Sequence, residues 1–319
     1  MTNQQELANT IKNVHIELRL SSRKLGADAA WEQHCKKSEL LKNYAQAMKK
    51  LATSHWETNN ANDPTMNRIY WVVQECEDFF FTGGAETAVS KEKKLFQKFV
   101  GENENFPIPN APVNRPLKML DVGSCYNPFR NFDLFDVTAV DIAPASDDVI
   151  ECDFLRTEIG EVDFLIESTY DVVLFSFLLE YLPEPKMRYA CCLKAYKLLK
   201  PGGVLVILTP DSKHDTANSK IMKTWRLGLA SIGFMRVNYK KLRHLRCMSY
   251  YKCRDSRSIR GWLELQKFDG SPEECVVIPQ DSNPYDSESA KDEIFRSETD
   301  NIQLAVNFAD MVNADVFVD

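Results

Sequence analysis

Several features that would assign this chain to a class of protein are missing from its sequence. No stretch approaches the roughly 18 consecutive apolar residues of a membrane-spanning helix. Residues 1–19 are polar and lack the apolar core of a secretory signal peptide. The nine cysteines are scattered and none form Cys-x-x-Cys, so their spacing supports neither a zinc site nor a disulfide framework. These absences predict no membrane insertion and a cytoplasmic or nuclear chain with free thiols.

Most of the chain also lacks an excess of charge of either sign. The formal net charge is −7, and residues 281–319 alone hold ten acidic residues against two basic ones. The rest is therefore nearly neutral, unlike a strongly basic nucleic-acid-binding protein. We predict an acidic, largely flexible tail over 281–319. Within it, Leu304, Phe308 and Val312 recur at the spacing of a short amphipathic helix.

A ligand-binding loop is predicted at the end of the apolar run LKMLDVGSC (117–125). Such a run is typical of a buried parallel strand, and Gly123 would let the backbone approach a ligand closely. A second apolar run ends in Asp141, where nucleotide-binding α/β folds place the acid that accepts hydrogen bonds from ribose hydroxyls. The loop lacks Gly-x-Gly-x-x-Gly, so it offers no glycine-lined site for a pyrophosphate. A phosphate-free nucleoside ligand such as S-adenosylmethionine, with S-adenosylhomocysteine as a competing ligand, fits this loop better.

The chain before this loop is predicted to be helical. Apolar residues recur every three or four positions through residues 1–105, and Asp63-Pro64 supplies an N-cap and a first-turn proline for a helix that ends near Gly83. The proline-rich stretch 106–116 is typical of a linker. We expect the helical domain to pack on the remainder of the protein, either as a structural cap or as a lid over the ligand.

After the linker, residues 117–280 alternate strand and helix patterns, which predicts an α/β domain with a doubly wound parallel sheet. Further strand patterns cover 148–155 and 170–179, and another follows the sequence LKPGG (199–203). An antiparallel hairpin over 235–253 would close the sheet. The order and spacing of these patterns resemble the class I methyltransferases, which have a Rossmann-like fold and bind S-adenosylmethionine.

This resemblance implies roles for residues at the ends of the strands. Asp153 would bind the adenine amino group, Phe154 would pack on the adenine ring, and Ser176 would contact the ligand after the fourth strand. Two more candidates lie in the flanking segments. Glu57 could reach the ammonium or ribose of the ligand, or be an ordinary surface acid. Arg115 could pair with the methionine carboxylate, or be a solvated arginine at a strand entry.

Positive charge gathers in one band of the chain, residues 236–260, which holds nine Lys or Arg residues and one acid, Asp255. Tyr239, Tyr250 and Tyr251 lie between these charges. Three interpretations stay open. The band could bind RNA phosphates, dock the acidic tail or an acidic partner, or be a solvated edge hairpin that its charge protects from pairing.

More of the sequence matches one family within this fold. The stretches DVGSCYNPF (121–129), TAVDIAP (138–144), CDFL (152–155) and FSFLLEYLP (175–183) resemble the fungal large-subunit rRNA adenine-N1 methyltransferases and their animal relatives. The animal branch comprises S-adenosylmethionine sensors upstream of mTOR complex 1. The resemblance implies that the unliganded protein binds the GATOR and KICSTOR complexes, near the lysosome, and restrains mTOR signalling until ligand releases it.

The exit of the fourth strand separates an enzyme from a sensor. Adenine-N methyltransferases usually place Asp or Asn-Pro-Pro-aromatic there, and its polar atoms orient the attacking amine. Here the position holds SFLL (176–179), which offers no acceptor for a base edge, although Phe177 could stack on a base. We assign no catalytic residue, and the sequence favours a ligand-gated interaction protein. Because ring-nitrogen methylation needs mainly positioning near the methyl group, a nuclear rRNA adenine-N1 methyltransferase stays the alternative.

Overall fold

A computed structural model describes residues 3–56, 67–107, 113–211, 218–242 and 245–282. The helical periodicity of the N-terminal third is confirmed. Its helices are α1 (Asn3–Leu25), α2 (Ala27–Cys35), α3 (Ser38–Leu51) with a π-helical turn (Ala52–Trp56), α5 (Arg68–Phe81) and α6 (Gly84–Phe99). The division of the chain into separate domains stays a prediction.

The start of α5 is fixed by a side-chain cap. Asn67 has extended backbone angles, and its side-chain oxygen accepts a 2.8 Å hydrogen bond from the backbone N–H of Ile69. This contact satisfies one of the backbone donors that every helix leaves free in its first turn. The start that the sequence predicted, Asp63-Pro64, lies outside the described residues.

A seven-stranded sheet forms the centre of the molecule, in the order β3-β2-β1-β4-β5-β7-β6. β1 to β5 run parallel, and β7 runs antiparallel to both of its neighbours. This order confirms the predicted α/β class I methyltransferase fold. The strands are β1 (Leu117–Val122), β2 (Phe135–Asp141), β3 (Ile150–Glu151), β4 (Tyr170–Ser176), β5 (Leu199–Pro210), β6 (Phe234–Lys241) and β7 (Leu245–Lys252).

Helices cover both faces of the sheet because alternate strand residues point to opposite sides. Leu120 and Val122 of β1 pack in the core that contains α7 and α8, whereas Leu117 and Met119 pack in the core that contains α5. The remaining elements are α7 (Pro185–Leu198), α8 (Ser219–Ile232), α9 (Ser256–Glu264) and the short 3-10 helices η4 (Pro272–Glu274) and η5 (Pro279–Ser282). None of the helices described is both long and apolar enough to cross a membrane.

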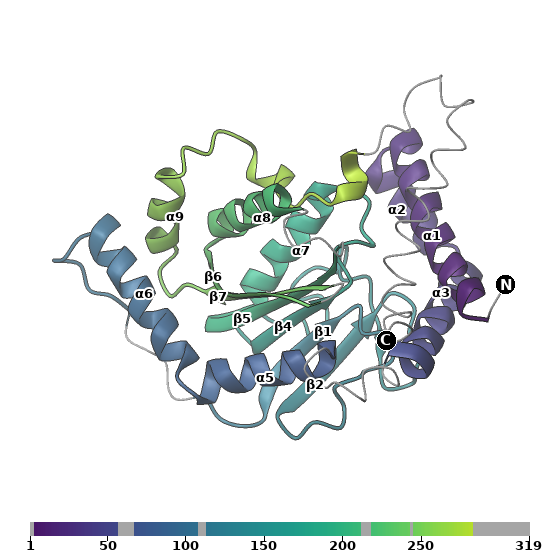
Figure 1. Ribbon diagram of the computed structural model, residues 1–319, viewed down its shortest axis with the longest axis horizontal. Coiled ribbons are helices and arrows are strands. Elements are labelled where there is room, and N and C mark those ends of the chain that lie inside the picture. The colour runs from purple at the N-terminus through teal and green to yellow at the C-terminus, as the bar shows by residue number, and fades with distance from the viewer. Residues whose placement is uncertain (1–2, 57–66, 108–112, 212–217, 243–244, 283–319) are drawn as a thin grey trace, which may run out of the picture.

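The N-terminal helices divide into two groups, as Figure 1 shows. α1, α2 and α3 lie beside the carboxyl ends of the strands, whereas α5 and α6 run along the side of the sheet domain. Buried contacts hold the second group: Glu92 of α6 accepts hydrogen bonds from the Tyr251 hydroxyl (2.8 Å) and the Asp255 backbone N–H (2.9 Å). Of the N-terminal helices that the structure describes, α1 to α3 are therefore the ones positioned to cover a ligand.

The predicted closing hairpin is present as β6 and β7, but only β6 lies at the edge of the sheet. Every residue of β7 is buried, including Arg246, Lys252, Tyr250 and Tyr251. Arg246 forms a 2.6 Å ion pair with buried Asp211. Two of the nine basic residues of the band, Arg246 and Lys252, are therefore interior, and neither buried tyrosine can stack on a base.

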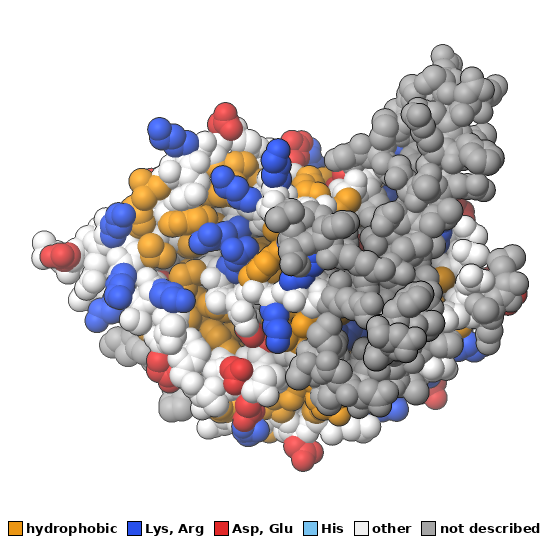
Figure 2. Space-filling view, viewed as in Figure 1, with side chains coloured by type: hydrophobic (Ala, Val, Ile, Leu, Met, Phe, Trp, Pro, Cys, Tyr) orange, Lys and Arg blue, Asp and Glu red, His pale blue; other side chains and the backbone are white. Residues whose placement is uncertain are grey.

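Exposed basic residues nevertheless remain around this hairpin. Figure 2 shows Lys and Arg side chains among hydrophobic ones on the face that α8, α9 and β6 present. Arg226 of α8 lies 4.4 Å from the ring centre of Trp262, and Arg236 lies 5.0 Å from that of Tyr239. These charges therefore shield part of the aromatic surface, and an anion would compete with the rings for them.

Candidate ligand-binding site

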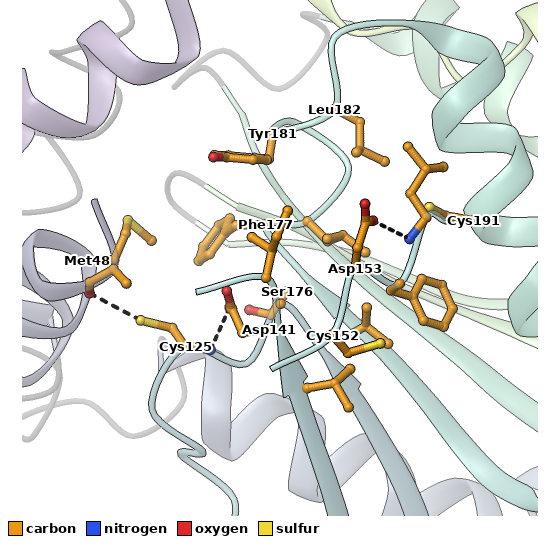
Figure 3. A pocket seen from close by; sticks show the side chains of 18 of the residues that line it. Met48, Cys125, Asp141, Cys152, Asp153, Ser176, Phe177, Tyr181, Leu182 and Cys191 are labelled. Atoms are coloured by element: carbon orange, nitrogen blue, oxygen red, sulfur yellow. Dashed lines mark hydrogen bonds between the residues drawn. The ribbon is translucent and has the colours of Figure 1, made fainter. Parts of the chain in front are cut away.

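A cavity opens where the carboxyl ends of β1, β2 and β4 meet helices α2 and α3 (Figure 3). Its empty volume is about 730 Å³, including the part open to solvent, and its lining of apolar and aromatic residues with a few polar groups is typical of small-molecule sites. In doubly wound folds, ligands bind outside the carboxyl ends of the strands, where the strand order reverses. β1 is that strand here, since β2 lies on one side of it and β4 on the other.

The floor of the cavity needs a glycine for two reasons. Gly123 has a φ of +75°, in the left-handed region that side chains other than glycine's disfavour. A Cβ atom at this position would also lie 3.3 Å from the Cδ1 of Leu178, which lines the cavity. The residue therefore keeps the space above β1 open, as the sequence predicted for a loop that approaches a ligand.

Asp141 ends β2 as a half-buried carboxylate held by backbone donors. Its Oδ2 accepts a 2.9 Å hydrogen bond from the N–H of Cys125, and its Oδ1 accepts one of 2.8 Å from that of Ala143. Burial raises the pKa of Asp141 to about 6, and the backbone hydrogen bonds limit the increase. At neutral pH the group is thus an ionised, oriented acceptor, which suits a pair of neighbouring hydroxyl groups.

Asp153 connects the cavity to α2. Its Oδ2 accepts a 2.8 Å hydrogen bond from the indole Nε1 of Trp31, and its Oδ1 accepts one of 3.0 Å from the N–H of Leu155. Trp31 itself lines the cavity. The carboxylate predicted to bind the adenine amino group is therefore also a contact point for a covering helix.

A cluster of aromatic rings joins α1, α2 and α3 to the wall of the cavity. Tyr181, in the loop after β4, has ring-centre distances of 5.2 Å to His15, 5.5 Å to His34, 5.1 Å to Tyr44 and 6.0 Å to Trp31. The His34 ring is also hydrogen-bonded to the Tyr181 hydroxyl. Burial lowers the pKa of His15 to about 3 and that of His34 to about 4, so both rings are neutral at physiological pH.

Phe177 follows β4 at the position where adenine-N methyltransferases carry an aromatic residue. Its φ is +63°, and its ring packs against a hydrophobic cluster that Leu51 and Ala52 form with Tyr126. The guanidinium of Arg68, at the start of α5, lies 5.8 Å from the ring centre and donates a 2.8 Å hydrogen bond to the Tyr126 hydroxyl. The ring that could stack on a base is therefore partly covered by this chain's own residues, although it also lines the cavity.

The structure brings most of the predicted ligand contacts to one place. The predicted residues that line the cavity are Gly123, Asp141, Asp153, Phe154 and Ser176. Figure 3 shows Asp141, Asp153 and Phe177 projecting toward the same space. Whether they touch a ligand stays a prediction.

The structure does not bring Arg115 to the cavity. Its guanidinium forms an ion pair with Glu77 and lies 4.4 Å from the ring centre of Phe81, both on α5. Arg115 precedes β1, so it lies at the end of that strand opposite to the cavity. The expected contact with a ligand carboxylate is therefore corrected to a contact that fastens α5. Glu57 lies outside the described residues.

Sequence reasoning missed the aromatic residues that line the cavity from outside the sheet. Trp31, Tyr44 and Tyr181 all do so. Tyr44 falls within a helical apolar pattern, which also describes an ordinary core residue. A buried aromatic residue with a polar atom usually finds a hydrogen-bond partner, but the sequence does not say that the partner of Trp31 is Asp153.

Comparisons with known proteins place the chain among relatives. A sequence model of the family described as "25S rRNA (adenine(2142)-N(1))-methyltransferase, Bmt2" matches residues 85–271. The protein named S-adenosylmethionine sensor upstream of mTORC1 from Xenopus laevis is 34% identical, with 97% of this chain and 84% of that protein covered. Its namesake from Danio rerio is 33% identical, with the same shares covered.

One solved structure with a similar arrangement is the Burkholderia thailandensis 1,6-didemethyltoxoflavin-N1-methyltransferase with bound 1,6-didemethyltoxoflavin and S-adenosylhomocysteine. It is 15% identical, the match covers 57% of this chain and 85% of that one, and the TM-score is 0.34. We therefore assign the fold from the strand order of the sheet and not from this similarity.

Proposed function

We propose that this chain, which belongs to the family of the 25S rRNA (adenine(2142)-N(1))-methyltransferase Bmt2, binds S-adenosylmethionine and acts as a sensor of that ligand upstream of mTOR complex 1. The observation that carries the proposal is the arrangement of the cavity, in which the helices that would report on the ligand contact the residues that would bind it. Near-full-length relatives that carry the name of such a sensor support it.

The residues present fit S-adenosylmethionine. Asp141 would accept hydrogen bonds from the ribose hydroxyls, and Asp153 would accept one from the adenine amino group. Phe154 would pack on the adenine ring, Gly123 would leave room beside the sulfonium, and Ser176 would contact the ligand from the end of β4. The apolar lining between these polar groups suits a ligand that has a purine ring and apolar carbons next to its sulfur atom.

A sensor further requires that ligand binding changes a surface seen by its partners. A ligand shifts such an equilibrium only through a difference in its affinity for the two states. The contact between Trp31 and Asp153 supplies a difference of this kind, because α2 and the adenine amino group would share one carboxylate. We infer that ligand binding alters the docking of α1 to α3, and that a surface they share with the sheet domain binds the GATOR and KICSTOR complexes in the cytoplasm, at the lysosome.

Methyl transfer to rRNA adenine is the second candidate, since the family model bears that description. The partly covered ring of Phe177 counts against it. This ring already contacts Arg68 and the cluster around Tyr126, which leaves less of its surface for an acceptor base to stack on. The buried positions of Tyr250 and Tyr251 also remove two aromatic residues from any RNA-binding surface.

The test combines ligand binding, methyl transfer and partner capture. Calorimetric titration with S-adenosylmethionine and S-adenosylhomocysteine should show binding that Asp141→Asn weakens and Asp136→Asn leaves unchanged. Asp136 is a matched control because it is an exposed acid of the same strand, away from the cavity. With radiolabelled methyl donor, total RNA should gain no label.

Partner capture supplies the signalling arm. Immobilised protein should retain GATOR and KICSTOR subunits from a cell extract without ligand and release them when S-adenosylmethionine is added. The Asp141→Asn variant should retain them at ligand concentrations that release the wild type. Labelling of a defined adenine would support the enzyme, whereas an absence of ligand binding would overturn both candidates.

A further inference from the structure

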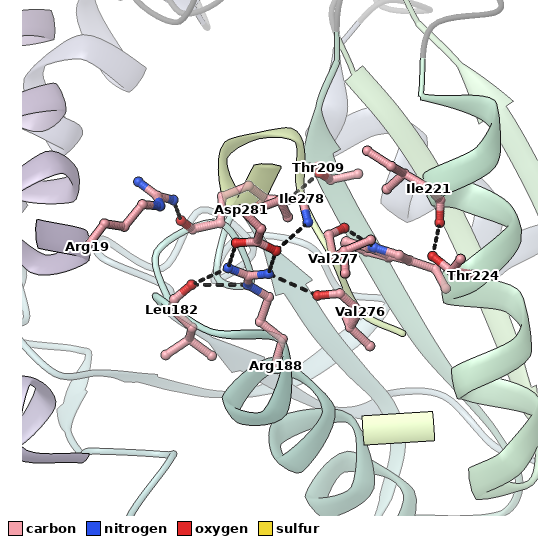
Figure 4. Close-up of polar contacts among 12 residues, drawn as sticks. Arg19, Leu182, Arg188, Thr209, Ile221, Thr224, Val276, Val277, Ile278 and Asp281 are labelled. Atoms are coloured by element: carbon pink, nitrogen blue, oxygen red, sulfur yellow. Dashed lines mark hydrogen bonds and ion pairs between the residues drawn. The ribbon is translucent and has the colours of Figure 1, made fainter. Parts of the chain in front are cut away.

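A buried ion pair joins the last described segment of the chain to the sheet domain. The guanidinium of Arg188, in α7, has no exposure to solvent. Its Nη1 and Nη2 donate hydrogen bonds of 2.6 and 2.8 Å to the two carboxylate oxygens of Asp281, in η5 (Figure 4). A bidentate pair of this geometry fixes both the position and the orientation of the groups that it joins.

The same guanidinium holds a wall of the ligand cavity. Its Nε and Nη2 donate hydrogen bonds of 3.0 and 2.9 Å to the carbonyl oxygen of Leu182, and Leu182 lines the cavity beside Tyr181. Its Nη1 also donates to the carbonyl oxygen of Val276 at 3.0 Å. All five N–H groups of Arg188 are thus used, and they connect the cavity wall with the C-terminal segment.

Helix α1 holds this wall from the other side. Arg19 donates a hydrogen bond to the carbonyl oxygen of Glu180, and the hydroxyl of Ser22 donates one of 3.1 Å to the carboxylate of Glu184. The loop 180–184 is therefore clamped between the covering helices and Arg188. Its shape depends on both contacts, because a loop without such partners has many conformations available to it.

Asp281 is the only carboxylate that pairs with Arg188 in the part of the chain that the structure describes. It also accepts a 2.9 Å hydrogen bond from the backbone N–H of Ile278, which holds it in place. A buried guanidinium that loses its counter-ion is strongly destabilised, so it moves toward water or draws water in. Either change would disturb its hydrogen bonds to Leu182.

We propose that Asp281 is a positioning residue for the ligand site, acting through Arg188 on the carbonyl of Leu182. This inference rests on the proposed function, because it needs a ligand in the cavity. The acidic stretch of the sequence begins at Asp281. Separation of the segment 279–282 from Arg188 would therefore weaken ligand binding, and ligand binding would in turn hold the segment in place, since such coupling is reciprocal.

The first experiment measures the affinity for S-adenosylhomocysteine in the full-length chain by calorimetry. Asp281→Asn should weaken binding about tenfold, because the amide loses a charge-assisted hydrogen bond to Arg188 that holds the cavity wall. Asp281→Glu, which keeps the charge, should recover part of the loss. The matched control is Glu92→Gln, which alters a buried hydrogen-bonded carboxyl near α9 and should lower thermal stability without changing affinity.

A second variant protects the test against misfolding of the first. Arg188→Met combined with Asp281→Leu replaces the buried pair with apolar side chains of similar volume, a change that folded proteins often tolerate. This double variant should fold and yet bind weakly, because it lacks the guanidinium that donates to the Leu182 carbonyl. Wild-type affinity in a folded Asp281→Asn or in the double variant would overturn the proposal.

Failure of the proposed function is recognised separately. If the wild type itself does not bind S-adenosylhomocysteine, hydrogen exchange of the amides in 178–184 still tests the link between Asp281 and the loop. Those amides should exchange faster in Asp281→Asn than in Glu92→Gln at matched stability. Equal exchange in the two variants would show that Asp281 does not position the loop.

Discussion

The indole Nε1 of Trp31 donates a 2.8 Å hydrogen bond to the carboxylate Oδ2 of Asp153. This contact holds α2 against the segment after β3, where adenine is proposed to bind. A carboxylate that serves both a covering helix and a ligand links the two events. If the adenine amino group takes a share of Oδ2, the hydrogen bond of Trp31 weakens. The helix then gains freedom when the ligand arrives, and this gives the cavity a means of signalling to α2.

Removing the indole donor tests this competition. Trp31→Phe keeps an aromatic ring and loses the N–H, so it should tighten binding of S-adenosylhomocysteine by about 0.5–1.5 kcal/mol, the net worth of one hydrogen bond. Calorimetric titration measures the change. Trp71→Phe, at a buried tryptophan of α5 outside the cavity lining, is the control and should leave affinity unchanged. Weaker binding by Trp31→Phe would mean that the indole holds the ligand rather than competing with it.

Asp141→Asn tests the ribose contact. The amide keeps the size of the side chain but loses the charge, and one of its two termini can no longer accept a hydrogen bond. Affinity for S-adenosylmethionine should fall by about 1.5–3 kcal/mol, the contribution of hydrogen bonds to a charged group. Isothermal titration calorimetry of both Asp141→Asn and Asp136→Asn separates this effect from the loss of one negative charge elsewhere on the same strand. Equal affinities for the two variants would place the ribose elsewhere.

Ligand affinity should depend on pH through Asp141. Because burial raises the pKa of this carboxyl to about 6, the free protein binds a proton there as the pH falls below that value. Binding to ribose hydroxyls favours the ionised form, so affinity should be constant above about pH 7 and then fall by up to about tenfold per pH unit below pH 6. Titrations from about pH 8 to about pH 5.5 measure this, and Asp141→Asn should remove the part of the dependence that this carboxyl contributes.

The stability of the fold also depends on pH, through several titratable groups. Folding must therefore be monitored in the samples used for the affinity measurements. The pKa of Asp141 in the folded state lies above its ordinary value, so the cost of its buried charge is relieved as the pH falls toward 4. His15 and His34 have the opposite effect. Their lowered pKa values mean that the unfolded chain binds more protons below about pH 6.5, so acid destabilises the fold. Circular dichroism should confirm that the protein stays folded at each pH used.

Gly123→Ala should affect both stability and binding. A φ of +75° is costly for alanine, and the expected destabilisation is about 1–2 kcal/mol. The new methyl group would also press on Leu178 in the cavity wall. Gly160→Ala is a matched control, because Gly160 has a φ of +87° with no atom near its Cβ position and lies outside the cavity lining. Thermal melts should show similar losses for both variants, whereas ligand titration should be impaired for Gly123→Ala alone.

The parallel sheet was predictable because its central strands β1, β4 and β5 are almost fully buried and therefore appear as nearly continuous apolar runs. The sequence also predicted where two strands end, because Gly123 directly follows β1 and Asp141 is the last residue of β2. Helix α9 was not predicted. Three arginines lie at positions 254–260, around the start of this helix, and their charge obscured an apolar face formed by Ile259 and Trp262.

The contacts between the covering helices and the cavity were not predictable in the same way. Trp31 and Asp153 are 122 positions apart, and no local spacing relates them. Arg115 shows the converse error. Its place beside the first strand suggested a ligand contact, but a parallel strand has two ends, and this arginine lies at the one where α5 provides Glu77 and Phe81.

The order of the strands in the sheet differs from their order along the chain. β5 ends at Pro210, yet one of its edges is covered only by β7, which pairs with it through residues 245–251. During synthesis, this apolar strand therefore has an open edge until β7 has left the ribosome. A transcript with a premature stop between these points would encode every residue of the predicted ligand site and still yield an unpaired edge. We expect such products to aggregate or be degraded, so alleles that stop between β5 and β7 should behave as complete losses of the protein.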